Sequence, residues 1–275
     1  GVPNPCLDCH RDKDHQWAAD YLEKRYGKRM EKYRFRFRTA GAAMQGRGST
    51  EALLKAYAAE EVSAWRATLL GLMAQYPLTP EVQETARRAV LDSDPLVRAA
   101  AVPLLPPAEL PHLLRDDARV VRHAAGWQLF PRVVHMPEGA TVLREMKETA
   151  ALQSDQPPGA MQLAMLATAA GNRAEAEKQY LRAIALDATS AVARMDYAVF
   201  LAQQNRLMEA LQQMLACTAA APDNAEAQYR LGILLVEVGM PEAGLRALEK
   251  AVRLQPTHAA AAETLRMLNQ QMKQR

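Results

Sequence analysis

The sequence predicts an all-α protein, a right-handed α-solenoid built from helical repeats with a cysteine-containing segment in front of them. Aromatic residues make up only 5% of the 275 residues, and runs of β-branched residues, which favour strands, are scarce. From about residue 157 onward small residues and prolines recur every 34 residues, and a second repeat occupies the middle of the chain. Such periods are typical of stacked helical pairs.

The composition also limits the classes of function. There are 34 Lys and Arg against 31 Asp and Glu, and the net charge of +3 is too small to indicate nucleic-acid binding by itself. No apolar run reaches the roughly 18 to 20 residues that a membrane span needs. The sequence has no G-x-S-x-G, no phosphate-binding glycine loop and no H-E-x-x-H, so we expect no enzyme active site in it.

Residues 1–38 open with a cofactor-attachment motif. Cys6, Cys9 and His10 form C-x-x-C-H, in which two thiols can reach the vinyl groups on one porphyrin edge while the histidine bonds the iron. The alternatives are a redox dithiol or half of a zinc site. Zinc would need a second ligand pair, whereas Cys217 falls in a repeat core, and a dithiol would need a βαβ context. The motif favours one covalent haem c, with His10 as the proximal ligand.

The sixth iron ligand is not evident from the sequence. His15 follows His10 by five residues, about 140° round a helix, so we expect it on the surface and not on the other haem face. The histidines of the middle repeats, His112, His123 and His135, are expected to be packed or solvated, as lone histidines more often are.

A basic segment follows the motif: residues 24–38 read KRYGKRMEKYRFRFR, with eight basic residues and four aromatic ones. Interleaved basic and aromatic residues can bind single-stranded nucleic acid, with a steep dependence on salt. They can equally form a linker between helices, with packed aromatic side chains and with arginines that face water, acidic partners or haem propionates. Because the rest of the chain has no basic face, the linker is favoured and no nucleic-acid partner is expected.

Residues 39–132 resemble HEAT-type helical pairs. The stretches 92–105 and 115–130 share an acidic turn, then Val-Arg, then an alanine-rich helix, and residues 60–73 form a weaker copy. This region is therefore expected to stack its helices as a structural array.

Arginines recur at equivalent places in these copies, at Arg66, Arg98 and Arg122. In such repeats an arginine commonly pairs with an aspartate of the neighbouring turn. The sequence offers Asp94 or Asp117 for this role and predicts a structural ladder.

Residues 133–156 are expected to be a connector helix between prolines. Residues 157–258 then resemble three tetratricopeptide repeats, in which a glycine or asparagine turns the chain between two helices and a late proline ends the second. The phases that recur are Gly171, Asn205 and Gly239; Tyr180, Met214 and Leu248; Ala183, Cys217 and Ala251; Ala176, Ala210 and Gly244; and Ala188, Pro222 and Pro256.

Residues 259–275 read as the capping helix that covers the last apolar face of a solenoid. The first helices of the repeats are expected to line a concave face that binds a protein partner, although such a face can also be an idle solvated surface. The predicted partner-binding residues on it are Met165, Met195, Asp196, Tyr229, Arg230 and Glu237.

The order of these parts resembles the C-terminal portion of periplasmic multihaem c-type cytochromes. Their last haem site is a G-x-P-N-x-C-x-x-C-H segment followed by Asp-Lys and by Gln-Trp-Ala-Ala-Asp, which are Asp12-Lys13 and Gln16 to Asp20 here. The resemblance implies haem attachment at Cys6 and Cys9 and a periplasmic or extracellular location in a bacterium. The upstream haem motifs of that family are not in this chain.

The sequence therefore predicts a fragment or subunit of a c-type cytochrome, with electron transfer at the front and partner recognition along the repeats. Trp17 and Tyr21 are expected to pack against the haem. The alternative is a non-haem interaction scaffold in which the C-x-x-C-H motif is unfilled. Because the chain starts without methionine or a signal-peptide pattern, we expect a processed product or a piece of a longer protein. A longer parent could be a multihaem oxidoreductase.

Overall fold

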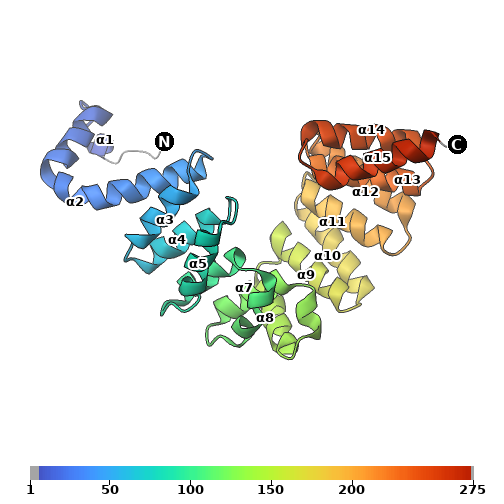
Figure 1. Ribbon diagram of the computed structural model, residues 1–275, viewed down its shortest axis with the longest axis horizontal. Helices are drawn as coiled ribbons and strands as arrows, with labels where there is room; N and C mark the ends of the chain where they lie inside the picture. The colour runs from blue at the N-terminus through green and yellow to red at the C-terminus, as the bar shows by residue number, and fades with distance from the viewer. Residues whose placement is uncertain (1–5, 274–275) are drawn as a thin grey trace. The chain divides into compact units, whose positions relative to one another are not determined.

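The computed structural model describes residues 6–273, except for the side chains of residues 28–30, 32 and 273. Every regular element within residues 6–273 is a helix, which confirms the all-α, helical-repeat fold (Figure 1). The residues Gly1, Pro3 and Asn4 of the cytochrome-like motif, and residues 274–275 of the predicted cap, lie outside the described residues.

The chain divides into two compact units, one that ends at Val142 and one that begins at Leu143. The boundary falls inside the predicted connector, in the first turn of a helix that starts at Gly139. None of the helices in the described part of the chain is both long and apolar enough to cross a membrane.

The first unit begins with the single turn α1 (Cys6–Cys9) and the long helix α2 (His15–Met44). Asp14 caps α2, because its carboxylate accepts a hydrogen bond from the Trp17 backbone N–H at 2.7 Å. The basic segment 24–38 is thus the interior of one helix and not a linker between helices. Its lysines, arginines and glutamate are good helix formers, and it contains no proline.

Helix α2 is bent (Figure 1). Glu23 and Arg34 form an ion pair, although these residues would lie roughly 16 Å apart along a straight helix. Gly27 lies on the stretch between them, and a Cβ atom there would come within 2.6 Å of the Glu23 carboxylate.

The prediction of packed aromatic side chains and outward-facing arginines is wrong in the second half of the basic segment. Tyr33, Phe35 and Phe37 are exposed, whereas Arg36 is buried. The Arg36 guanidinium donates two hydrogen bonds of 2.6 Å to the Glu60 carboxylate. It also lies 5.1 Å from the ring centre of Tyr33 and 5.0 Å from that of Trp65. This contact fixes α2 to the helices that follow.

The rest of the first unit stacks short helices. They are α3 (Thr50–Ala58), α4 (Ser63–Met73), α5 (Pro80–Ala89), α6 (Pro95–Ala101), α7 (Arg119–Leu129) and the 3₁₀ turns η1 (Val102–Leu104), η2 (Pro107–Glu109), η3 (Pro111–Arg115) and η4 (Arg132–His135). Their core consists of fully buried aliphatic side chains, among them Leu53, Leu69, Leu70, Val82, Val97 and Leu110. Burial of such side chains stabilises each helix against its neighbours.

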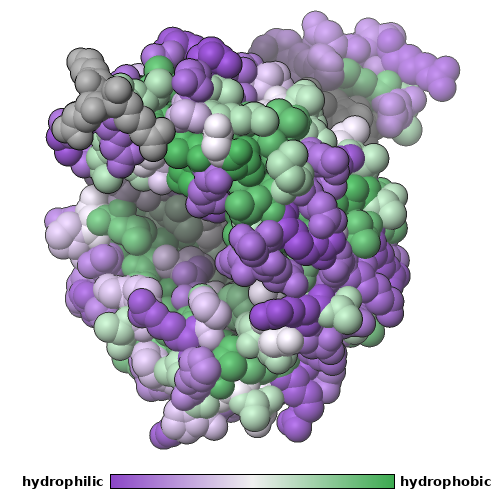
Figure 2. Space-filling model, turned by 90° about the vertical axis from the view of Figure 1, so that its right-hand side faces the viewer, coloured by the Kyte–Doolittle hydropathy of each residue, from purple (hydrophilic) through white to green (hydrophobic). Residues whose placement is uncertain are grey.

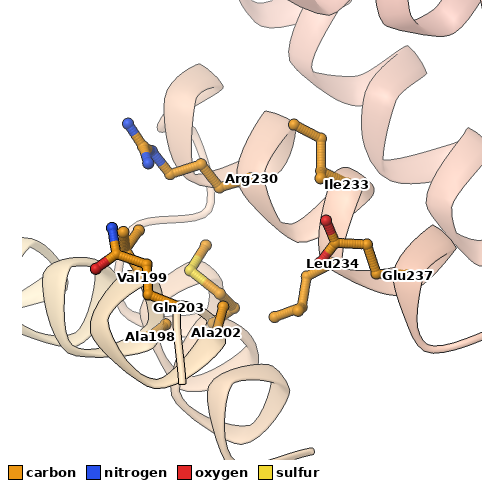
Figure 3. Close-up of a pocket in the computed structure, with 9 residues that line it drawn as sticks. Ala198, Val199, Ala202, Gln203, Arg230, Ile233, Leu234 and Glu237 are labelled. Carbon is orange, nitrogen blue, oxygen red and sulfur yellow. The ribbon is translucent and has the colours of Figure 1, made fainter. Parts of the chain in front are cut away.

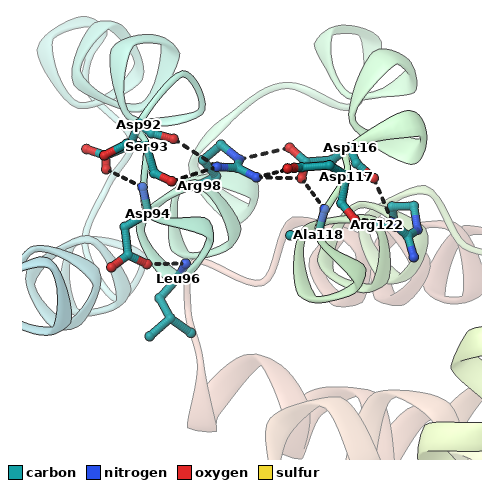
Figure 4. Close-up of polar contacts among 9 residues, drawn as sticks. All are labelled: Asp92, Ser93, Asp94, Leu96, Arg98, Asp116, Asp117, Ala118 and Arg122. Carbon is teal, nitrogen blue, oxygen red and sulfur yellow. Dashed lines mark hydrogen bonds and ion pairs between the residues drawn. The ribbon is translucent and has the colours of Figure 1, made fainter.

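Arg98 links the turns before α6 and α7 (Figure 4). Its guanidinium pairs with the carboxylates of Asp116 at 2.7 Å and Asp117 at 2.6 Å. It also donates to the backbone carbonyls of Asp92 at 3.0 Å and Ser93 at 3.2 Å. One side chain therefore holds its own turn and the next turn together.

The neighbouring arginines repeat parts of this pattern. Arg66 pairs with Asp92 at 2.5 Å, and Arg122 donates to the carbonyls of Asp116 and Asp117 at 2.7 and 2.9 Å. The predicted ladder is confirmed, with Asp117 as one of its members. The other aspartate that the sequence offered, Asp94, caps α6 by accepting from the Leu96 N–H at 2.9 Å.

The second unit is a series of antiparallel helical pairs followed by one last helix (Figure 1). Its elements are α8 (Gly139–Leu152) from Leu143 onward, α9 (Pro157–Ala169), α10 (Arg173–Leu186), α11 (Ala191–Ala202), α12 (Leu207–Ala220), α13 (Ala225–Glu237), α14 (Pro241–Leu254) and α15 (Ala259–Lys273). The three pairs α9/α10, α11/α12 and α13/α14 occupy the 34-residue units expected from the sequence.

The turn inside each pair contains one left-handed residue. Gly171, Asn205 and Gly239 have φ values of 73°, 60° and 82°. Glycine and asparagine tolerate this conformation far better than other residues do. The recurring phase in the sequence is therefore the residue that reverses the chain between the two helices of a pair.

Small residues let the two helices of a pair approach closely. A Cβ atom on Gly232 of α13 would come within 2.7 Å of Leu248 in α14, and one on Gly244 of α14 would come within 2.8 Å of the Gly232 carbonyl oxygen. Cys217 of α12 is fully buried in the core of the unit, where its thiol donates to the Ala191 carbonyl at 3.2 Å. The prediction that Cys217 is structural is confirmed.

Candidate functional site

A cavity of about 470 Å³ lies at the C-x-x-C-H motif. It is lined by Cys6, Cys9, His10, Trp17, Ala18 and Tyr21. All of these residues come from α1, from the residue that follows it, or from the first two turns of α2. The cavity thus contains the three residues of the attachment motif and both aromatic residues that were expected to pack against a haem.

Local structure brings these side chains together. The His10 N–H donates to the Cys6 carbonyl at 3.0 Å, so one helical turn places both cysteines and the histidine on adjoining positions. The cap at Asp14 then starts α2 in a new direction. As a result the His10 and Trp17 rings lie 4.8 Å apart, and Trp17 stacks on Tyr21 at 5.8 Å.

These residues fit a covalently attached haem. Two thiols and one imidazole line the same cavity, and aromatic rings supply an apolar wall for a porphyrin. Cys6 is half-buried, whereas Cys9 and His10 are exposed, so a group on this surface would be accessible from solvent. His10 is the one side chain of the motif that can bond iron, because the two cysteines would be consumed as thioethers.

The other histidines lie away from this cavity lining. His15 is exposed at the start of α2, and His112 and His135 are exposed in the first unit. His123 is half-buried and accepts a hydrogen bond from the Trp127 indole N–H at 3.2 Å. His123 is thus packed, and His15, His112 and His135 are solvated, as expected.

The second unit contains another cavity, of about 320 Å³, between the first helices of two consecutive pairs (Figure 3). It is lined by Ala198, Val199, Ala202 and Gln203 of α11, Met214 of α12, and Arg230, Ile233, Leu234 and Glu237 of α13. We call this set the α11/α13 groove. Apolar side chains form most of its wall, and Gln203, Arg230 and Glu237 supply its polar groups.

Hydrophobic side chains also reach the surface elsewhere in this unit. Figure 2 views the molecule from the side on which α11 to α15 are drawn in Figure 1, and it shows apolar patches between hydrophilic ones. Leu181 and Leu215, on the second helices of two pairs, are about half exposed, at 49% and 50%. These two leucines occupy equivalent positions of two repeats and do not line the groove.

Two of the six predicted partner-binding residues, Arg230 and Glu237, line the groove. Asp196 lies one helical turn before Val199 on α11, and Tyr229 packs its ring 4.9 Å from that of His258. Met165 is half-buried on α9, and Met195 packs partly against the core.

Sequence reasoning missed the apolar wall of the groove, especially Val199 and Ile233. These two residues share the 34-residue phase of Met165, which was selected. Gln203 likewise shares the phase of Glu237. The missing residues could therefore have been found by extending each selected phase through all three repeats.

Some of the charged side chains in and beside the groove have partners within the described part of the protein, and others do not. Arg230 donates to the Glu226 carboxylate at 2.6 Å, and the other Glu226 oxygen lies 2.9 Å from His258. Burial opposes ionisation of Glu226, but the hydrogen bonds with His258 and Arg230 and their charges outweigh it, so its pKa is lowered. Burial raises the pKa of Asp196, with only partial opposition from the Arg230 charge.

Comparison with known proteins identifies the type of the last repeat. The tetratricopeptide repeat family model matches residues 225–258. No curated protein sequence matches the chain. Solved structures resemble parts of it: a tetratricopeptide-repeat protein from Thermus thermophilus aligns at 15% identity and a TM-score of 0.49, over 68% of this chain and 98% of that one.

Two further structures show similar coverage. The protein YrrB, described as a tetratricopeptide-repeat protein with an unusual peptide-binding site, aligns at 21% identity and a TM-score of 0.41, over 78% of this chain and 98% of its own. MamA from Desulfovibrio magneticus RS-1 aligns at 23% identity and a TM-score of 0.45, over 57% and 87%. By its sequence match and its paired helices, the α13/α14 segment, residues 225–258, is a tetratricopeptide repeat.

Proposed function

We propose that this chain is an interaction scaffold whose second unit binds a segment of a partner protein in the α11/α13 groove. The observation that supports this proposal is that equivalent positions of two consecutive repeats line one cavity. These positions are Val199 with Ile233 and Gln203 with Glu237. A repeated, solvent-accessible apolar wall with polar groups at its edge suits an amphipathic or extended peptide. The role of these residues is binding and not catalysis.

Blocking the groove should abolish partner binding without unfolding the repeats. The double substitution Val199→Glu and Ile233→Glu places two carboxylates on the apolar wall, where an apolar ligand side chain would have to desolvate them. Partners from an extract of the source organism, captured on the immobilised protein and quantified by mass spectrometry, should fall at least about tenfold. The double variant Leu181→Glu and Leu215→Glu, with charges on more exposed positions outside the groove, should capture the wild-type set.

Circular dichroism is the control for folding. Both double variants should have the helical signal of the wild type. Equal capture by the groove variant and the wild type, with intact helicity, would show that partners bind elsewhere.

We also propose that Cys6 and Cys9 hold one haem c by thioether bonds, with His10 as the proximal iron ligand. The cavity that contains all three residues, walled by Trp17 and Tyr21, supports this second function. When bound, the haem would supply one-electron transfer. The two cysteines would hold the haem by its edge, His10 would bond its iron, and Trp17 and Tyr21 would shield it from water. Covalent attachment takes place outside the cytoplasm, so we propose a periplasmic or extracellular location.

The haem proposal is tested by intact mass after denaturation. Protein matured in a bacterial periplasm that contains the haem-attachment machinery should be heavier than its polypeptide by one haem, because thioether bonds survive unfolding. The double variant Cys6→Ala and Cys9→Ala should have the bare mass and the same helical signal. Replacing the buried Cys217 with alanine is the matched control and should leave the adduct in place. If periplasmic wild-type protein has only the mass of its polypeptide, the haem proposal is wrong and only the interaction-scaffold function remains.

A further inference from the structure

Negative charges predominate at the α11/α13 groove once internal pairs are counted. Arg230 is the cation among the lining residues, and its guanidinium is already bonded to Glu226 at 2.6 Å. Glu237 lies two helical turns further along α13 and is exposed. Pairing within the protein therefore neutralises Arg230 and leaves carboxylate charge facing a ligand.

Asp196 is a half-buried carboxylate close to the groove on α11. It lies three residues before Val199 on α11, so its side chain is on the same side of the helix as the groove wall. Its side chain makes no hydrogen bond or ion pair with any residue of the described range 6–273, and Arg230 acts on it only through its charge. A half-buried carboxylate without a donor is costly, and a ligand cation would reduce that cost.

Most of the wall of the cavity beside Asp196 is apolar. Val199, Ala202 and Ile233 line it, Met214 and Leu234 close it, and its volume is about 320 Å³. An apolar cavity of this kind takes a bulky aliphatic or aromatic side chain, which gains free energy by leaving water. The acceptor at Asp196 and the apolar cavity are within a few residues of each other on α11.

From this juxtaposition we infer the chemistry of the partner segment. The groove takes a peptide in which a lysine or arginine lies within two positions of a bulky apolar residue, with the cation at Asp196 and the apolar side chain in the cavity. This inference rests on the proposed function of the groove. It predicts discrimination against acidic peptides, because these would bring like charges to Asp196 and Glu237.

A displayed library of random dodecapeptides, selected on the immobilised full chain, tests the inference. Enriched peptides should carry Lys or Arg beside Leu, Ile, Met or Phe. The best synthetic peptide, followed by fluorescence anisotropy, should bind D196N about tenfold or more weakly, as loss of a charged hydrogen bond implies. It should bind E242Q, which alters an exposed carboxylate on α14, as tightly as the wild type.

The outcomes separate this inference from the proposed function. Peptides that are acidic, or have no charge bias, or bind D196N as well as wild type would overturn the basic-apolar assignment while the groove remains a binding site. Failure of the wild type to enrich any peptide beyond the V199E/I233E double variant would overturn both. A dimer in sedimentation that the double variant abolishes would show that a second copy of this chain occupies the groove, which also overturns the inference.

Discussion

Replacing Arg36 with alanine should lower the free energy of unfolding of the first unit by about 3–5 kcal/mol, the range for breaking one side of a buried ion pair. The Arg36 and Glu60 side chains are only 7% and 4% exposed. Without Arg36 the Glu60 carboxylate would keep two backbone donors, the N–H groups of Glu61 and Val62, but lose its counter-charge. The rings of Tyr33 and Trp65 would lose the guanidinium between them.

Urea unfolding followed by tryptophan fluorescence measures this change, because Trp65 reports on the contact. Arg38→Ala is the matched control, since Arg38 is an exposed arginine two residues further along the same helix, and it should leave the midpoint unchanged. The double variant R36A/E60A should be less destabilised than R36A alone, because no unpaired charge remains. Equal destabilisation of R36A and R38A would contradict the role given to Arg36.

The same ion pair should make stability depend on pH in a defined direction. Burial opposes ionisation of Glu60, but hydrogen bonds from Arg36 and from the Val62 and Glu61 N–H groups outweigh it, so the pKa of Glu60 lies below its ordinary value of 4.5. A lowered pKa means that the folded state holds the proton less tightly than the unfolded state does. The contribution is therefore complete above about pH 4.5, and it should be lost as the pH falls through the folded-state pKa. In R36A the free energy of unfolding should therefore fall less steeply as the pH is lowered below about 4.5.

The second large effect is expected at Arg98, where alanine should cost about 2–3 kcal/mol. Asp116 has 10% side-chain exposure and would lose its cation, and the carbonyls of Asp92 and Ser93 would lose their donor. Burial opposes ionisation of Asp116, but Arg98 and the Ala118 N–H more than compensate and lower its pKa. The expected cost is smaller than at Arg36, because Asp117 is 89% exposed and can be solvated by water.

Hydrogen exchange locates this effect. In R98A the amides of the two turns, residues 92–94 and 116–118, should exchange faster, whereas those of α9 to α14 should be unchanged. Arg88→Ala is the control, because Arg88 makes a surface pair with Glu84 on its own helix and should not alter exchange in either turn. Uniform acceleration across both units would indicate that Arg98 acts on global stability and not on the turns.

The repeats were predictable from the sequence because their signals are local and periodic. Turn residues such as Gly171 and Gly239 recur in step with the 34-residue period, and each has a backbone conformation that few residue types adopt. The N-terminal cavity was also within reach, because Trp17 and Tyr21 are one helical turn apart and follow the motif closely. What recurs along the chain, or lies within a turn or two of a motif, could be predicted.

The remaining features depend on contacts between distant residues. Nothing in the run of eight basic residues distinguishes Arg36, and only Glu60, 24 residues later, selects it for burial. In the same way Asp116 and Asp117 are adjacent in sequence, and the shape of their turn decides that Asp116 is the one held in the interior. The positions of the groove wall recur in phase with Met165 and Glu237, but the cavity itself forms only where two helices from different repeats face each other.

The left-handed turn common to the three pairs makes the length of the second unit a variable that can be engineered separately from its chemistry. Asn205 and Gly239 reverse the chain in equivalent places, so a duplicate of residues 191–224 inserted after residue 224 would end and begin at compatible helix boundaries. Such an insertion would add a second copy of Asp196 and Val199 one repeat further along. The number of repeats would then set how long a peptide the groove accepts, while the side chains of each repeat set which residues it accepts.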